Sequence, residues 1–191
     1  GAVQAEFVIN SAGAWGGAIA AALGEPVPIE PVAPMMMITD RLPPFITPVV
    51  GSASRYISFK QLPNGTALIG GGRLGTADPS RNIARLDLPG LQMMAETARD
   101  LFPIMRQTRV VRCWAGIEGH MKDGIPVIGP SSTEPGIYHA FGFSSHGFQL
   151  GPVIGRILAE LITEGHSTLP IAPFSIARFV AHGQDQGSKE A

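Results

Sequence analysis

Residues 137–163 read IYHAFGFSSHGFQLGPVIGRILAELIT, and this stretch decides how the second half of the chain folds. Ile137–Phe141 is a short apolar run, which is typical of a buried strand. Gly142–Gly151 is rich in glycine and indicates a loop, and Pro152–Thr163 has the apolar spacing of a helix that ends at Gly165. We therefore expect a strand, a glycine-rich loop and a helix in succession.

A second unit of the same kind lies near the start of the chain. Phe7–Asn10 is another apolar run, and Ser11–Gly13 forms a small-residue turn after it. Ala14–Leu23 is rich in alanine, has helical spacing and is followed by Gly24. These residues predict a strand, a turn and a helix.

The middle of the chain favours strands. Prolines between positions 26 and 34 exclude a regular helix there. Asn64-Gly65 lies between two runs of β-branched and aromatic residues, which is a strong hairpin signal. The other expected elements are strands at 32–39, 55–62, 66–70, 109–118 and 126–129 and a helix at 89–102, and the polar residues 180–191 are expected to fray.

Composition limits the classes of function. Of the 191 residues, 15% are charged, against about 25% in typical soluble domains. The formal net charge is −1, so nucleic acid is not an expected partner. Such low charge together with 24 glycines and 17 prolines suggests a domain that packs against a neighbour. We therefore expect a part of a larger protein, with a merely apolar small domain as the alternative.

The cysteine and histidine patterns indicate neither a disulfide framework nor a metal site. Cys113 is the single cysteine, and the five histidines include no HxxxH pair. No apolar run reaches 18 residues and the sequence does not open on a signal peptide. We expect a cytoplasmic location, with peripheral attachment to the inner membrane as the alternative.

Two glycine-rich turns are the candidates for chemistry. In NSAGAW, residues 10–15, a glycine turn between a strand and a helix could place backbone amides around a phosphate. The alternative is tight packing of the strand on the helix. In residues 142–152, backbone amides at a helix start, flanked by Phe143 and Phe148, suit a planar anionic or electron-accepting ring. The alternative is a loop with two core phenylalanines.

Three motifs together resemble a known family. NSAGAW, WAGIEGHMKDGIPVIG (114–129) and HAFGFSSHGFQLGPVIG (139–155), in this order and spacing, resemble the flavin-dependent D-amino-acid oxidase family. That family includes glycine oxidase, the sarcosine oxidases and dye-linked amino-acid dehydrogenases. FKQLPNGTALIGGGR (59–73) looks most like the flavoprotein subunit of opine or hydroxyproline dehydrogenases. The resemblance covers about residues 5–165.

The resemblance implies a fold. It implies the C-terminal half of a two-domain flavoenzyme, of class α+β, with a mixed-sheet substrate domain, flanking helices and the last part of a Rossmann-like FAD domain. The N-terminal GxGxxG half would be a missing partner. The implied segments are FAD-domain strand–turn–helix at 1–25, substrate domain at 26–112, flavin-facing part at 113–165 and tail at 166–191.

The resemblance also implies site residues. The loop would line the flavin, and the amides of Gln149 and Leu150 would lie near flavin O2. The substrate would contact Tyr56, Arg73 and Glu118. The residues expected to contact FAD are Ala12, Gly13, Trp114, Gly116, Ser145, His146, Gly147, Phe148, Gln149 and Leu150.

Three departures from the family pattern matter. In glycine oxidase-like members an arginine binds the substrate carboxylate where this chain has Glu118, and Arg73 could replace it, or be merely solvated. Monomeric sarcosine oxidases attach flavin to a cysteine that would fall near Gly116, so we expect non-covalent FAD and a core role for Cys113. They also place a lysine above the flavin for oxygen reduction, where this chain has Leu68.

The resemblance therefore implies an FAD-dependent dehydrogenase or oxidase that removes hydride from a C–H next to the nitrogen of an amino acid or amine. No residue is singled out as an obligatory catalytic acid or base. The rival interpretation is a scaffold subunit of the same fold without flavin. Other subunits of a heteromeric dehydrogenase are possible further partners in either case.

Overall fold

The structure is a computed structural model that describes residues 1–180. The predicted frayed tail lies outside the described residues, apart from Val180. The chain divides into two compact units. Unit 1 combines Gly1–Pro31 with the chain from Glu118 onward, and unit 2 is Val32–Ile117. No helix within residues 1–180 is long and apolar enough to cross a membrane.

Unit 1 is built on a three-stranded sheet in the order β1-β11-β10. Strand β1 (Val8–Asn10) runs parallel to β11 (Ile137–Phe141), and β10 (Val127–Pro130) runs antiparallel to β11. The other elements of the unit are η1 (Gly13–Trp15), α1 (Gly16–Ala22), β9 (Glu118–Met121), α3 (Gly147–Glu164), η3 (Ala172–Phe174) and α4 (Ala177–Val180).

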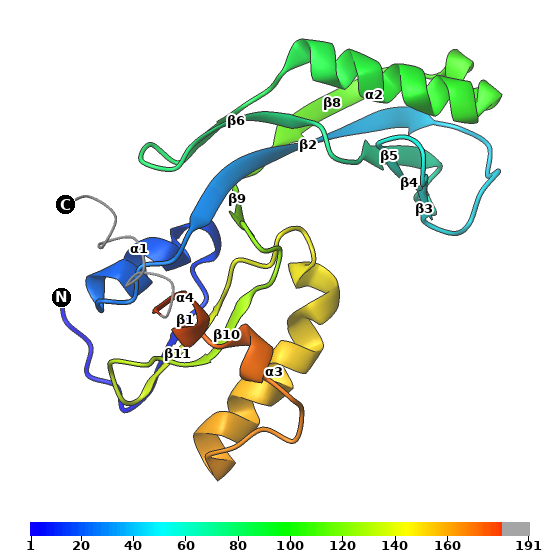
Figure 1. Ribbon diagram of the computed structural model, residues 1–191. Helices are drawn as coiled ribbons and strands as arrows, with labels where there is room; N and C mark the ends of the chain where they lie inside the picture. The colour runs from blue at the N-terminus through cyan, green and yellow to red at the C-terminus, as the bar shows by residue number, and fades with distance from the viewer. Residues whose placement is uncertain (181–191) are drawn as a thin grey trace. The chain divides into compact units, whose positions relative to one another are not determined.

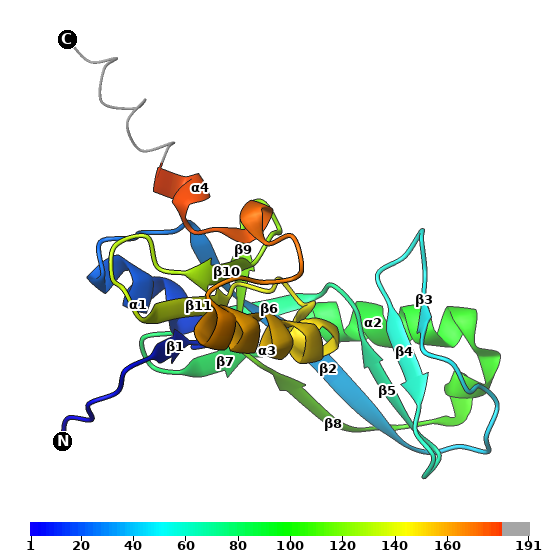
Figure 2. The same cartoon turned by 90° about the horizontal axis from the view of Figure 1, so that it is seen from below.

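The two faces of this sheet pack against different helices. Ile128 of β10 and Ala140 of β11 cluster with the apolar stripe of α3. The helix lies beside these two strands in Figures 1 and 2. Phe141, which points to the other face, clusters with Ala20 of α1. A Cβ on Gly16 would lie 2.4 Å from Phe141 Cγ, so α1 approaches the sheet this closely only because position 16 is glycine.

Unit 2 is a larger sheet organised by one long strand. Strand β2 (Ile29–Arg41) pairs antiparallel with β5 (Thr66–Gly70) on one side and β8 (Val110–Ala115) on the other. Strands β3 (Val50–Gly51) and β4 (Ser58–Gln61) extend the sheet beyond β5. The remaining elements are β6 (Leu74–Asp78), β7 (Ile83–Arg85), α2 (Leu88–Leu101) and η2 (Pro103–Gln107).

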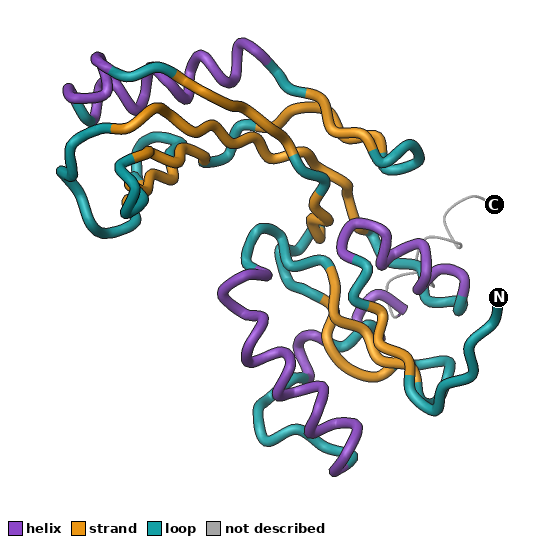
Figure 3. The backbone as a smooth tube through the Cα atoms, turned by 180° about the vertical axis from the view of Figure 1, so that it is seen from behind, coloured by secondary structure: helices purple, strands orange, loops and turns teal. Residues whose placement is uncertain are grey.

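Helix α2 lies along one face of this sheet (Figures 1 and 3). Side chains alternate along β2, so that Met35 and Met37 are fully buried and pack with Leu91 and Met94 of α2. The Asp87 carboxylate caps the helix by accepting a 2.8 Å hydrogen bond from Gly90 N–H. The alternate residues of β2, including Met36 and Ile38, lie on the opposite face.

The sequence predictions need three corrections. Helix α3 begins at Gly147, not at Pro152, because Gly147 and Gly151 do not have the positive φ that a glycine loop would use. The hairpin β6–β7 was missed because GTAD shows no apolar alternation. The strand predicted at 109–118 is interrupted, since β8 ends at Ala115 and β9 starts at Glu118.

Candidate functional site

The two glycine-rich turns lie at one edge of the unit 1 sheet. Strands β1 and β11 are parallel neighbours, so their carboxyl ends meet at the same edge. Residues 11–16 leave β1 there, and residues 142–150 leave β11. We call these two segments the carboxyl edge. In open α/β sheets, ligands bind outside the carboxyl ends of the strands.

The loop after β11 has a strained backbone. Gly142, Ser144 and Ser145 have φ of 74°, 49° and 71°, in the left-handed region. For the two serines this costs on the order of 1–3 kcal/mol each, so other contacts must hold them. Ser144 Oγ accepts a 3.0 Å hydrogen bond from Met121 N–H, and Ser145 Oγ donates one of 2.7 Å to Glu118 Oε2. Strand β9 therefore fixes the shape of the loop.

Glu118, His120 and Ser145 form a polar cluster at this edge. His120 Nε2 lies 3.3 Å from Glu118 Oε2 and 3.2 Å from Ser145 Oγ. Although a serine, a histidine and a carboxylate meet here, they do not form a nucleophilic triad. The serine donates to the carboxylate, and both partners contact the same imidazole nitrogen, whereas a triad uses one nitrogen for each. The cluster thus holds an imidazole without activating the serine.

The start of α3 presents backbone donors. The first-turn amides of a helix have no intrahelical acceptor, which leaves those of Gly147, Phe148 and Gln149 directed out of the helix. The amide of Leu150 donates within the helix to His146 O at 3.2 Å. No acidic residue lies in the first turn, and the helix dipole therefore favours an anion there.

The two phenylalanines of this loop have different surroundings. Phe143 packs against the α3 core, as the alternative interpretation expected. Phe148 is fully exposed, at 100%. Its ring therefore lies at the surface beside the first-turn amides of α3.

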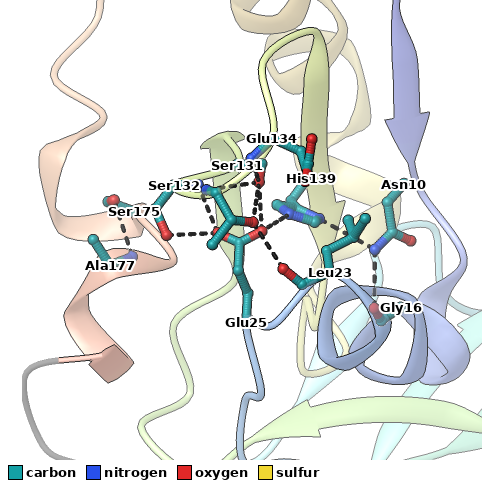
Figure 4. Close-up of polar contacts among 11 residues, drawn as sticks. Asn10, Gly16, Leu23, Glu25, Ser131, Ser132, Glu134, His139, Ser175 and Ala177 are labelled. Atoms are coloured by element: carbon teal, nitrogen blue, oxygen red, sulfur yellow. Dashed lines mark hydrogen bonds and ion pairs between the residues drawn. The ribbon is translucent and has the colours of Figure 1, made fainter.

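A buried polar network supports the turn after β1 (Figure 4). Asn10 Nδ2 donates to Gly16 O at 2.9 Å and contacts His139 Nδ1 at 3.2 Å, and Asn10 Oδ1 accepts from Ala12 N–H. An amide nitrogen only donates, so Nδ1 of His139 accepts and Nε2 carries the proton. His139 Nε2 then donates to Glu25 Oε2 at 3.1 Å.

Glu25 is the charged end of this network. It is fully buried, and burial alone would raise its pKa, but hydrogen bonds from Ser131, Ser132 and His139 outweigh that effect and lower the pKa to about 2. Sequence analysis did not identify this network, because Glu25 and His139 are far apart in sequence and neither lies in a recognisable motif.

In unit 2 the expected residues lie on or beside the sheet face opposite α2. Register places Trp114 opposite Met36, and its ring lies 5.8 Å from the Arg112 guanidinium carbon. Gly116 N–H donates to Pro34 O at 3.2 Å, which continues this pairing. Cys113 points the other way and packs against the α2 side, and burial raises the pKa of its thiol.

Tyr56 and Arg73 lie together at the end of the β4–β5 hairpin. The Arg73 guanidinium carbon is 5.5 Å from the Tyr56 ring centroid. Gly71 and Gly72 have φ of 115° and 74°, and this turn brings Arg73 O within 3.1 Å of Met35 N. Tyr56 is 67% exposed, so one face of this pair is open to a ligand.

One row across the same sheet face joins four strands. Lys60 pairs with Leu68, Leu68 with Ile38, and Ile38 with Arg112. Directly opposite residues point to the same face. Lys60 and Ile38 are therefore the two direct cross-strand neighbours of Leu68 on this face, and the side chains of Leu68 and Ile38 separate Lys60 from Arg112.

The structure thus gathers the expected residues in two groups. Unit 1 brings Ala12, Gly13, Glu118 and residues 145–150 to the carboxyl edge, and unit 2 brings Tyr56, Arg73, Trp114 and Gly116 to one end of its sheet. His120 was missed, although its alternation with Glu118 on a short strand was a usable signal.

Comparison with known proteins gives a family match. A sequence model described as "FAD dependent oxidoreductase" (DAO) matches residues 1–161. The chain is 29% identical over 180 residues to hydrogen cyanide synthase subunit HcnC of Pseudomonas aeruginosa, covering 94% of this chain and 42% of that protein. It is 28% identical to glycine oxidase of Geobacillus kaustophilus, covering 94% of this chain and 46% of the relative.

Solved structures agree with the fold. The crystal structure of L-proline dehydrogenase from P. horikoshii superposes with a TM-score of 0.84 at 28% identity, covering 92% of this chain and 47% of that one. Glycine oxidase from Geobacillus kaustophilus superposes with a TM-score of 0.82 at 26% identity, covering 92% and 46%. The chain therefore spans a little less than half the length of the relatives that it matches.

Proposed function

Since this chain belongs to the family of FAD-dependent oxidoreductases, we propose that it is the C-terminal half of an enzyme that oxidises a C–N bond of an amino acid or secondary amine. Bound FAD would supply the hydride acceptor, and the residues of this chain would bind and orient both cofactor and substrate. The L-proline dehydrogenase and glycine oxidase relatives are named for amino-acid substrates, which supports this substrate class.

The observation that carries the proposal is the carboxyl edge of unit 1. Ala12 and Gly13 follow one parallel strand, and residues 145–150 follow its neighbour, so two segments with exposed backbone meet at one place. The outward amides of Gly147–Gln149 and the exposed ring of Phe148 suit an aromatic ring that gains negative charge on reduction.

We propose that FAD binds non-covalently, and the position of the single cysteine supports this. Cys113 belongs to unit 2 and packs against the α2 side of its sheet, so its sulfur does not point to the face that carries Trp114. Burial disfavours the thiolate, which is the nucleophilic form. We propose that Trp114 and Gly116 contact FAD through packing alone.

Substrate recognition would rest on Tyr56, Arg73 and Glu118. The Arg73 guanidinium can bind a carboxylate through two hydrogen bonds, and the Tyr56 ring holds it in place. Glu118 is a half-exposed carboxylate, so it would attract the ammonium group or a cationic arm of the substrate rather than its carboxylate.

The partner of this chain would be an N-terminal half that carries the pyrophosphate-binding strand and helix. Strand β1 is an edge strand, and its Val8 and Ile9 are 49% and 44% exposed, which suits an added neighbour. Further subunits are proposed because HcnC and sarcosine oxidase subunit beta are named as subunits. A scaffold role without flavin is the second candidate.

The test is anaerobic reduction of flavin in the complete protein. It is purified with its N-terminal half and mixed with a panel of amino acids and secondary amines while flavin absorbance is recorded. The proposal expects a yellow protein that at least one of these compounds bleaches. A colourless protein would favour the scaffold role, and in a parallel titration this chain alone should bind FAD only weakly.

A further inference from the structure

His120 lies in the polar cluster at the carboxyl edge, and none of the roles above uses it. Its side chain is 33% exposed, and that of Glu118 is 42% exposed. Nε2 contacts Glu118 Oε2 and Ser145 Oγ, and the serine hydroxyl itself donates a hydrogen bond to the glutamate oxygen. A carboxylate only accepts, so Nε2 carries a proton, and Nδ1 is the basic nitrogen of the neutral ring.

The strain around this cluster points to a functional role. Ser145 adopts a left-handed conformation at φ 71°, and its hydroxyl joins Glu118 in fixing the imidazole. Strained residues that are held by side-chain contacts concentrate at active sites. A carboxylate that orients one nitrogen of a histidine and stabilises its charged form leaves the other nitrogen ready to accept a proton.

Building on the proposed function, we propose that His120 Nδ1 is the general base that takes a proton from the substrate's ammonium group. The ammonium N–H bond breaks, the proton bonds to Nδ1, and the electron pair stays on the substrate nitrogen. That neutral nitrogen has the electron pair that C=N formation would need, and bound FAD would supply the acceptor for the hydride that the neighbouring carbon loses. Glu118 and Ser145 are positioning residues that stabilise the resulting imidazolium.

The charges around His120 are consistent with this role. On β9 the ionisable neighbours are Glu118 and, beyond Met121, Lys122. The packed turn η1, Gly13–Trp15, has no ionisable side chain, and the stretch of β2 in this unit contributes Glu30. The loop after β11 adds His146 next to Ser145. Of these groups, Glu118 is the one that an observed contact places against His120, with its carboxylate oxygen 3.3 Å from Nε2.

The test compares His120→Gln with wild type in the complete holoenzyme. Flavin reduction by substrate is followed anaerobically by stopped flow at a series of pH values. We expect flavin reduction in His120→Gln to be slower by about 100-fold or more near neutral pH, which is within the range for loss of a general base. The defect should shrink as the pH approaches the pKa of the substrate amine, because solution then removes the proton.

Controls separate this proposal from a structural effect and from failure of the proposed function. His166→Gln, an exposed histidine beyond α3, should leave reduction unchanged. If His120→Gln binds FAD poorly, Ser145→Ala is used, and an unaltered pH dependence would then overturn the proposal. Reduction of His120→Gln at the wild-type rate near neutral pH would also overturn it. If no amine reduces the wild type, the proposed function itself fails.

Discussion

The carboxyl edge of unit 1 and the open sheet face of unit 2 present different chemistry to a ligand. The edge offers mainly backbone, with left-handed residues at Gly142 and Ser145 and free amides at Gly147–Gln149. The sheet face offers side chains, with an aromatic ring at Trp114 and cations at Arg112 and Lys60. Backbone sites suit a cofactor that never changes, whereas side chains can vary with the substrate.

The largest expected effect concerns the electron acceptor and the sheet face. Leu68 occupies the position that we matched to an oxygen-activating lysine, and an apolar side chain gives no stabilisation to superoxide-like charge. Substrate-reduced holoenzyme should therefore pass electrons to an artificial dye faster than to oxygen by orders of magnitude. One anaerobic preparation of the reduced enzyme is mixed either with dye or with oxygen, and the two rates of flavin reoxidation are compared.

The register sharpens this prediction, because Lys60 lies directly opposite Leu68 on the same face. If oxygen reoxidises the flavin as fast as the dye does, Leu68 does not decide the acceptor. Lys60→Met would then show whether the neighbouring cation is responsible, since it should remove the reaction with oxygen and spare the reaction with dye.

The next effect concerns the buried support of the carboxyl edge. Glu25→Ala removes the acceptor of His139 Nε2 and of two serines, and each buried donor left without an acceptor costs about 1–3 kcal/mol. Urea unfolding of the complete protein measures the loss. As a control, Arg55→Ala breaks the exposed pair with Asp100 in unit 2 and should cost about 1 kcal/mol or less. An equal loss of unfolding free energy in the two variants would contradict the view that the buried network of unit 1 contributes more to stability than the exposed ion pair of unit 2.

The same network predicts how stability depends on pH. The pKa of Glu25 is lowered from 4.5 to about 2 in the folded chain, so its contribution is fully present above pH 4.5 and is lost as the pH falls toward 2. A shift of this size corresponds to about 3 kcal/mol. In Glu25→Gln, the free energy of unfolding should fall less steeply between pH 4.5 and pH 2 than in the wild type. An unchanged pH dependence would mean that other carboxylates cause the loss of stability in acid.

A smaller effect tests the sheet face. In the complete enzyme, Arg73→Lys should raise KM for a carboxylate substrate about tenfold, because lysine cannot reproduce the two-point contact, a loss of about 1.4 kcal/mol. FAD affinity should stay unchanged. Steady-state kinetics gives KM and a flavin titration of the same preparation gives the FAD affinity. An unaltered KM would remove Arg73 from the substrate site.

Local signals explain what the sequence could predict. The strand–turn–helix at residues 7–23 and the Asn64-Gly65 hairpin follow from apolar spacing and turn chemistry within a few residues. The start of α3 was predicted too late along the chain. The sequence alone does not distinguish a glycine that forms a loop from a glycine in a helix that leaves space for a neighbouring side chain. A Cβ on Gly147 would come within 3.3 Å of Phe143, so room explains that glycine.

The candidate site was predictable only in its glycine-rich turns. The Glu118–His120–Ser145 cluster needs a serine with positive φ, for which the sequence has no signal. The Glu25–His139 pair joins residues far apart in sequence, and only the folded sheet and the segment after α1 bring them together. Polar contacts over such distances depend on topology, which apolar periodicity does not specify.

The central claim is that FAD binds at the carboxyl edge, and Phe148→Glu tests it most directly. Phe148 is fully exposed, and a carboxylate in the first turn of α3 stabilises the helix slightly, so the fold should not suffer. The same carboxylate would repel an anionic flavin edge and remove an aromatic contact. Leu88→Glu, at the first residue of α2 and 72% exposed, is the matched control in unit 2.

The measurement is FAD affinity of the complete apoprotein, followed by flavin fluorescence. We predict that Phe148→Glu weakens binding by tenfold or more while the thermal midpoint of the apoprotein is unchanged or slightly higher, and that Leu88→Glu binds FAD like the wild type. Wild-type affinity in Phe148→Glu would contradict the placement of FAD at the carboxyl edge.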